Sequence, residues 1–117
     1  MDKYIPEFFN QLYVYSSVSV PLIDTLEILK KRNTKKKIIL FIDSVQQSIK
    51  DGKSLRTAFH GLYEKKIIDS VTWSLISIAD NSGDVSSLFK SIAEYTKEKR
   101  ESQYALFTSL MYPVGMI

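Results

Sequence analysis

Residues 69–99 read DSVTWSLISIADNSGDVSSLFKSIAEYTKEK and predict two helices joined by a turn. On each side of the turn at Asp80–Asp84, apolar residues recur at spacings of three and four, which places each set on one face of a helix. Gly83 can adopt the left-handed conformation that ends a helix, and Asp84 can cap the first N–H groups of the next. We therefore expect an antiparallel helix pair whose apolar faces are covered by the rest of the chain. The two apolar sets are Val71, Leu75, Ile76 and Ala79, and Val85, Leu88, Phe89, Ile92 and Tyr95.

Four more helices are predicted upstream, and no segment of useful length alternates with the period of two that marks a strand. The first spans about residues 6–18, and Ser19 caps a second helix that has Pro21 in its first turn. The third spans about residues 35–51, and Ser54 caps a short fourth helix. These patterns predict an all-α protein.

Each of these four helices carries one apolar stripe that is expected to face the core. We place Phe9 and Tyr13 on the flank of the first helix, and we expect Ile39 and Leu40 to bury the third helix on more than one side. The stripes are Phe8, Leu12 and Tyr15; Leu22, Leu26 and Leu29; Ile38, Phe41, Ile42, Val45 and Ile49; and Leu55, Ala58, Phe59 and Leu62.

The composition fits one globular domain, with 117 residues of which 44% are hydrophobic and 25% charged. The chain has no Cys, which excludes a disulfide scaffold, a thiolate metal site and a cysteine nucleophile. Its net charge of +3 and pI near 9.0 suit an anionic partner, although most mildly basic chains are simply soluble proteins.

The C-terminal part changes character along its length. The last helix is expected to start at Asp84 and continue to Ser109 or beyond, with a polar surface over residues 96–103 and no charged residue over 105–117. We expect residues 1–103 to form a cytoplasmic helical bundle and residues 104–117 to begin the first transmembrane segment of a longer protein. Lys97, Lys99 and Arg100 would then lie on the cytoplasmic side. The alternative is a C-terminal helix packed into the core.

The most basic stretch joins the second and third helices. A solvated loop between helices is one interpretation, and a contact site for anionic lipid headgroups or an acidic partner is the other. Nucleic acid is disfavoured, because no aromatic side chains lie between the charges to stack on bases. The candidate contact residues are Lys30, Lys31, Arg32, Lys35, Lys36 and Lys37.

The sequence offers little catalytic chemistry, and we expect no catalytic residue, no bound cofactor and no enzymatic activity. His60 is the single histidine and has no recognisable partner for acid–base catalysis. Residues 80–84 partly match a calcium loop, but the glycine stands too early in the 12-residue register and Ser91 stands where a bidentate Glu is needed. Asp80 and Asp84 are weak metal candidates, and a helix end followed by an N-cap explains both carboxylates equally well.

Three blocks of residues, spaced over residues 9–117, carry a family resemblance. The first is Phe9-Asn10-Gln11-Leu12, Ser17-Val18-Ser19-Val20-Pro21-Leu22 and Thr25-Leu26-Glu27; the second is Val45, Ile49, Gly52, Ser54-Leu55 and Ala58; the third is Val71, Leu75-Ile76, Ala79-Asp80-Asn81-Ser82-Gly83-Asp84-Val85, Leu88 and Ile92-Ala93-Glu94-Tyr95. In these blocks the chain resembles the cytoplasmic domain of the F protein of bacterial type II secretion systems and the related platform proteins of type IV pilus machines. The family-motif positions are Pro21, Leu22, Leu26, Gly52, Ser54, Leu55, Asp80, Ser82 and Gly83.

The chain departs from the family pattern at three positions, with Ser19 and Ala79 where glycine is usual and Asp80 where Glu is usual. The resemblance implies an antiparallel six-helix bundle, as the first of two such domains in an inner-membrane protein with three spans. It also implies a non-enzymatic platform on the cytoplasmic side of the bacterial inner membrane, which couples a cytoplasmic assembly ATPase to pilin or pseudopilin assembly. Other inner-membrane assembly proteins and further copies of the platform are the remaining implied partners.

One alternative function stays open from the residues themselves. A free-standing basic helical module would bind nucleic acid or an acidic protein through residues 30–37. Steeply salt-dependent binding to DNA or RNA would favour this alternative.

Overall fold

The computed structural model describes the backbone of residues 3–116 and the side chains of residues 3–102 except Ser82. Within this range the fold is all-α, with six helices and no strand, which confirms the predicted fold class. The helices are α1 (Tyr4–Ser17), α2 (Leu22–Arg32), α3 (Lys36–Lys50), α4 (Leu55–Glu64), α5 (Ser70–Ser82) and α6 (Val85–Met116).

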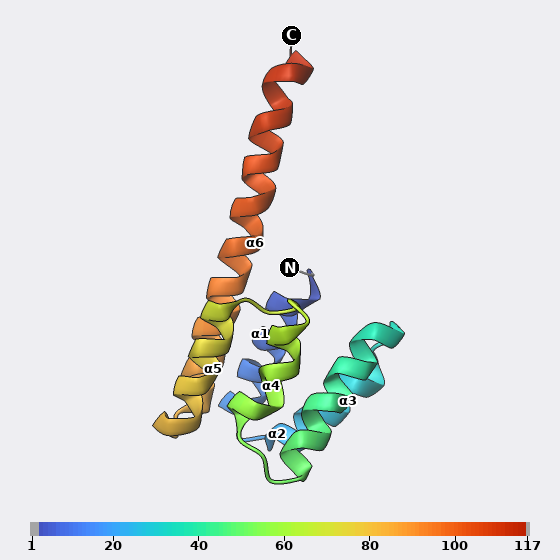
Figure 1. The fold of residues 1–117 in the computed structure, drawn as a ribbon, viewed down its shortest axis with the longest axis vertical. Helices are drawn as coiled ribbons and strands as arrows, with labels where there is room; N and C mark the ends of the chain where they lie inside the picture. The colour runs from blue at the N-terminus through green and yellow to red at the C-terminus, as the bar shows by residue number, and fades with distance from the viewer. Residues whose placement is uncertain (1–2, 117) are drawn as a thin grey trace.

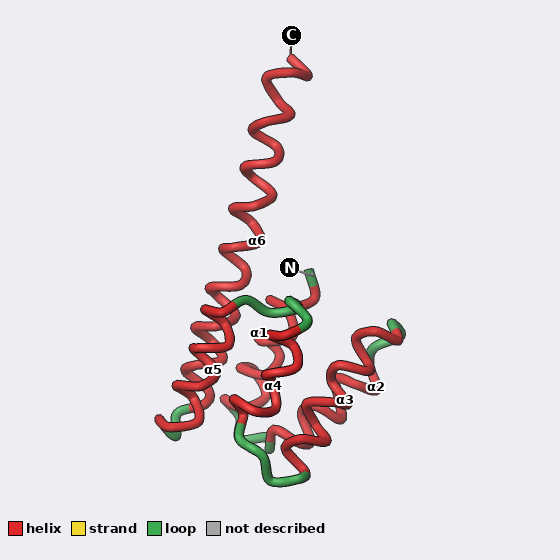
Figure 2. The backbone as a smooth tube through the Cα atoms, viewed as in Figure 1, coloured by secondary structure: helices red, strands yellow, loops and turns green. Residues whose placement is uncertain are grey.

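Consecutive helices run in opposite directions, so the fold is an antiparallel bundle (Figure 1). α1 packs along the N-terminal half of α6, and α4 and α5 lie beside them. The α2–α3 hairpin forms an outer wall that contacts the rest of the bundle through α1 and α4. The two connections between α2 and α3 and between α4 and α5, together with the start of α1, therefore lie at the end from which α6 departs (Figure 2).

The centre of the core is a cluster of phenylalanines around α1. Phe8 and Phe9 are fully buried, with ring centroids 5.3 Å apart. Phe9 also contacts Phe59 of α4 at 5.9 Å and Phe89 of α6 at 6.4 Å. The expectation that Phe9 lies on the flank of its helix is therefore wrong. α1 has helices on two adjacent sides, so two neighbouring positions are buried instead of one stripe.

Two other burial expectations are wrong, because the helices concerned lie at the edge of the bundle. Leu40 on α3 is 59% exposed, since α3 has neighbours on one side only. On α5, Val71 is 46% exposed because the buried face follows Thr72, Ile76 and Ala79. These three residues are spaced by four and three, as one face of a helix requires.

The helix ends follow the predicted chemistry with one exception. The Ser54 side chain accepts a hydrogen bond from the Thr57 amide at 3.1 Å, and Gly83 ends α5 in the left-handed conformation with φ of 75°. Ser19, in contrast, does not cap α2. It lies in the preceding turn with φ of 66°, and Pro21 is the N-cap residue.

α6 leaves the bundle without a break. It is helical to Met116, and its C-terminal half extends well beyond the other helices, as Figure 1 shows. The predicted continuation past Ser109 is confirmed, and the alternative in which the C-terminal helix packs into the core is wrong. In the described residues, no helix combines the length and the apolar character needed to cross a membrane.

Candidate functional site

The three motif blocks come together at the end of the bundle opposite to the departure of α6. Leu22 from the first block, Leu55 from the second and Val85 from the third line one hollow of about 360 Å³. Pro21 starts α2 at this end, and its carbonyl accepts a hydrogen bond from the Thr25 amide at 2.9 Å. Leu26 follows one helical turn later and is fully buried. The motif residues therefore build one corner of the bundle.

Asp80 joins two of these blocks directly. Its carboxylate oxygens accept hydrogen bonds from the backbone N–H groups of Leu55 at 2.8 Å and Arg56 at 2.7 Å. These are the first N–H groups of α4, which have no partner inside their own helix. Asp80, which is on α5, thus caps the start of α4. Ser54, the residue that precedes α4, caps the same helix end.

The two metal candidates are held in separate roles. Asp80 faces α4, whereas Asp84 accepts a hydrogen bond from the Ser87 amide at 3.2 Å at the start of α6. In the part of the chain that the structure describes, no group of three or more His, Asp or Glu side chains could hold a metal ion. The arrangement favours the helix-end interpretation of both carboxylates over a metal site.

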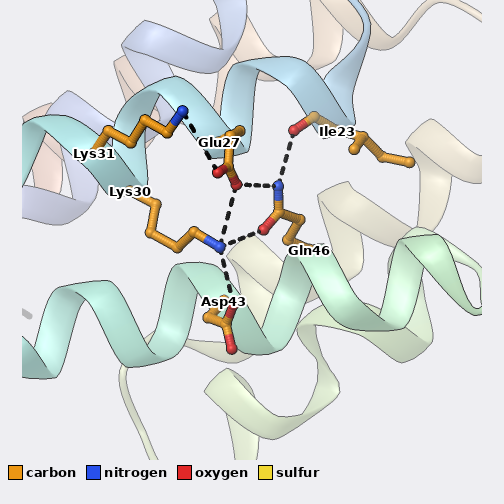
Figure 3. A network of polar contacts seen from close by, with 6 residues as sticks. All are labelled: Ile23, Glu27, Lys30, Lys31, Asp43 and Gln46. Carbon is orange, nitrogen blue, oxygen red and sulfur yellow. Dashed lines mark hydrogen bonds and ion pairs between the residues drawn. The ribbon is translucent and has the colours of Figure 1, made fainter.

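A buried glutamine organises the polar contacts between α2 and α3 (Figure 3). The Gln46 amide donates to the Ile23 carbonyl at 3.2 Å and to Glu27 at 2.9 Å. Its oxygen accepts a hydrogen bond from Lys30 at 2.8 Å, and Lys30 also contacts Asp43 at 3.0 Å. Hydrogen bonds from Gln46 and Lys30 lower the pKa of Glu27, and the hydrogen bonds to Asp43 and Glu27 raise the pKa of Lys30.

This network separates the basic candidates into two groups. The Lys30 ammonium is engaged within the domain, and Arg32 donates to the Tyr15 hydroxyl at 3.2 Å. Lys31 lies 3.9 Å from Glu27 but is 75% exposed at the end of α2, and the remaining lysines are exposed around the start of α3. The exposed candidates are Lys31, Arg32, Lys35, Lys36 and Lys37.

An aromatic cluster fixes α5 to α4. Trp73 stacks on Tyr63 with ring centroids 4.7 Å apart, and its indole N–H donates to the Arg56 carbonyl at 3.0 Å. The Arg56 guanidinium lies over the indole at 4.7 Å. His60 lies beside the same indole at 5.1 Å and its Nδ1 is 3.2 Å from Glu64. Stacking and cation–π contacts of this kind stabilise packing.

A second polar cluster fixes α6 where it leaves the bundle. Asp69 caps α5 through the Thr72 amide at 2.8 Å, accepts from the Tyr95 hydroxyl at 2.6 Å and forms an ion pair with Lys99. Burial acts to raise the pKa of the Asp69 carboxyl, but the hydrogen bonds from Lys99, Tyr95 and Thr72 outweigh it and hold the pKa well below its usual range. The hydrogen bond to Asp69 raises the pKa of Lys99.

Sequence reasoning missed both of these long-range contacts. Asp80 is 24 residues or more from the amides that it caps, and Asp69 is 30 residues from Lys99. One sequence signal pointed to the contact between Asp80 and the start of α4: Ser54, Leu55 and Asp80 are all family-motif positions. Lys99, predicted from the sequence to lie on the cytoplasmic side next to the membrane, also holds α6 against the start of α5.

The fold and these contacts define an all-helical bundle domain with one projecting helix. Residues 8–117 match the family described as type II secretion system (T2SS), protein F, and the chain belongs to that family. The chain is also 25% identical over 111 residues to the type IV pilus assembly protein PilC of Pseudomonas aeruginosa. That match covers 94% of this chain and 29% of the relative.

Proposed function

We propose that this chain is the first cytoplasmic domain of an inner-membrane platform protein in a type IV pilus or type II secretion machine. In this role it couples a cytoplasmic assembly ATPase to the assembly of pilin or pseudopilin subunits, without catalysing a reaction itself. It contacts other inner-membrane assembly proteins, and copies of the platform associate with each other. Family membership supports the class of machine, and the extension of α6 supports the mechanical role.

The continuous α6 is the observation that carries this proposal. Its N-terminal half is packed against α1, and Asp69 holds it through Tyr95 and Lys99 just before it leaves the bundle. A continuous hydrogen-bonded helix is stiff over a few tens of ångströms, because bending it requires breaking backbone hydrogen bonds. Movement of the bundle would therefore be transmitted along α6 into whatever the projecting half enters.

The proposal is tested by interrupting α6 in the host bacterium. Three glycines inserted after Glu101 should uncouple the projecting half from the bundle, because glycine lowers helix stability by about 1 kcal/mol per residue. We expect surface pili or secreted substrate to be lost, while the protein accumulates at its normal level.

The matched control carries the same insertion after Gly52, in the loop between α3 and α4. This loop changes direction with a positive φ at Gly52 and should accommodate added glycines. Assembly should persist in the control. Normal assembly with the insertion in α6 would show that force is not transmitted through this helix.

A further inference from the structure

Two basic segments that are far apart in the sequence lie at one end of the bundle. The connections between α2 and α3 and between α4 and α5 are both at the end from which α6 projects (Figure 1). We call this set of exposed residues the basic end. It consists of Lys31, Arg32, Lys35, Lys36, Lys37, Lys65 and Lys66.

The two segments form one continuous surface. Lys37 from α3 and the pair Lys65 and Lys66 border the same hollow of about 170 Å³, whose lining includes Ile38 and Phe41. The sequence pattern predicts a contact site only at residues 30–37, so the structure adds the second segment. Charges that converge on one face produce a stronger local potential than the net charge of the chain indicates.

Helix stability does not account for the lysines at the start of α3. Lys36 and Lys37 occupy its first turn, which contains no acidic residue, and Lys35 is an N-cap residue whose side chain makes no capping hydrogen bond. Cations at this position oppose the helix dipole, whereas Lys31 and Arg32 at the end of α2 complement it. Among the described residues, no ion pair compensates Lys35, Lys36 or Lys37.

The opposite end of the bundle has no such excess of positive charge. Its connections and helix ends carry Lys50, Lys53 and Arg56 together with Asp24, Asp51, Asp80 and Asp84. The bundle is therefore electrically asymmetric along the direction of α6, and its positive end faces the same way as the projecting helix.

We propose that the basic end binds the surface of a bilayer that contains anionic phospholipids, with the lysines contacting headgroup phosphates. The inference rests on the proposed function to the extent that α6 enters that bilayer. The polar residues 100–103, which follow the Lys99–Asp69 ion pair, would then separate bundle and membrane by about 6 Å at 1.5 Å per residue. Screening lengths of about 8–10 Å, together with extended lysine side chains, bring the basic end within reach of the headgroups.

The test is binding of the purified 117-residue chain to vesicles. We would compare phosphatidylcholine alone with phosphatidylcholine containing about one-third phosphatidylglycerol. Any insertion of the projecting helix occurs with both vesicle types, so their difference reports the cations near the membrane, and the charge-reversal variants assign it to the basic end. We expect preference for the anionic vesicles, and we expect it to fall steeply when the salt concentration is raised.

Charge-reversal variants locate the surface. K36E/K37E and K65E/K66E should each weaken binding to anionic vesicles about 30-fold or more, since each cation near such a surface contributes about fivefold. K50E/K53E changes the net charge equally at the opposite end and should bind like the wild type. Circular dichroism melting checks the fold, and K36E/K37E should melt no lower than the wild type because it improves the charge at the start of α3.

The outcomes distinguish this inference from the proposed function. Equal loss of binding in K50E/K53E, no preference for anionic vesicles, or tighter binding to duplex DNA than to these vesicles would overturn the basic end as a membrane contact. Binding through the basic end, combined with normal assembly when α6 is interrupted in the cell, would overturn the proposed function and leave this inference standing.

Discussion

Two carboxylates, those of Asp69 and Asp80, each stabilise a contact between helices. Asp69 binds a tyrosine, a lysine and a backbone amide, and its pKa is lowered although it is partly buried. Its unfolded-state pKa is the ordinary one, so the unfolded chain binds a proton first as the pH falls. The stabilisation is therefore complete at neutral pH and is lost progressively below about pH 5.

Replacement of Asp69 by Asn tests this pH dependence. The D69N variant keeps an N-cap residue but loses the ion pair, so we expect it to be about 1–2 kcal/mol less stable at pH 7. The difference in free energy of unfolding from the wild type should shrink as the pH is lowered from 7 to about 3. Urea denaturation at a series of pH values measures it. A constant difference would show that the Asp69 charge does not stabilise the fold.

At the scale of elements, the helices stabilise each other's ends as well as their faces. Asp80 on α5 satisfies two orphan amides of α4, and Trp73 on α5 donates to a carbonyl of α4. The α4–α5 pair is thus connected by directional contacts at the corner where the motif blocks meet. Val71 and Leu40 are exposed for a related reason, since edge helices have only one packed face.

The variant D80A should reveal the capping between helices. We expect a loss of about 1–2 kcal/mol in the free energy of unfolding, as for other removed caps. D51A is the control for net charge: Asp51 lies at the end of α3, where an acidic residue opposes the helix dipole, so its loss should cost little. Chemical denaturation compares the two. If D80A and D51A are equally stable, water replaces the Asp80 carboxylate at the first amides of α4 without loss of stability.

At the scale of the whole molecule, the stabilising contacts in the described part of the chain belong to the bundle and not to the projecting half of α6. Every buried core residue among the described side chains lies between Ile5 and Thr96. The ion pair of Lys99 with Asp69 anchors α6 close to the point where it leaves the bundle. The domain boundary at residue 103 stays a prediction, which truncation of the chain tests.

A chain that ends at Ser102 should therefore fold as the full chain does. We expect its free energy of unfolding to change by less than about 1 kcal/mol. A chain that ends at Tyr95 loses Thr96 and Lys99 as well, and should be clearly less stable. Thermal denaturation followed by circular dichroism distinguishes them. A shorter chain that fails to fold when only residues 103–117 are removed would contradict the predicted boundary.

The sequence by itself determined the helices, the helix ends at Ser54 and Gly83 and the projecting last helix, because periodicity, Gly83 and Ser54 act over a few neighbouring residues. It also carried the motif blocks that identify the family. The tertiary structure alone decided that Phe9 is central, that Asp80 caps α4, and that Lys37 lies beside Lys65 and Lys66. These contacts join residues far apart in the chain, and they depend on how the helices pack, which no local pattern encodes.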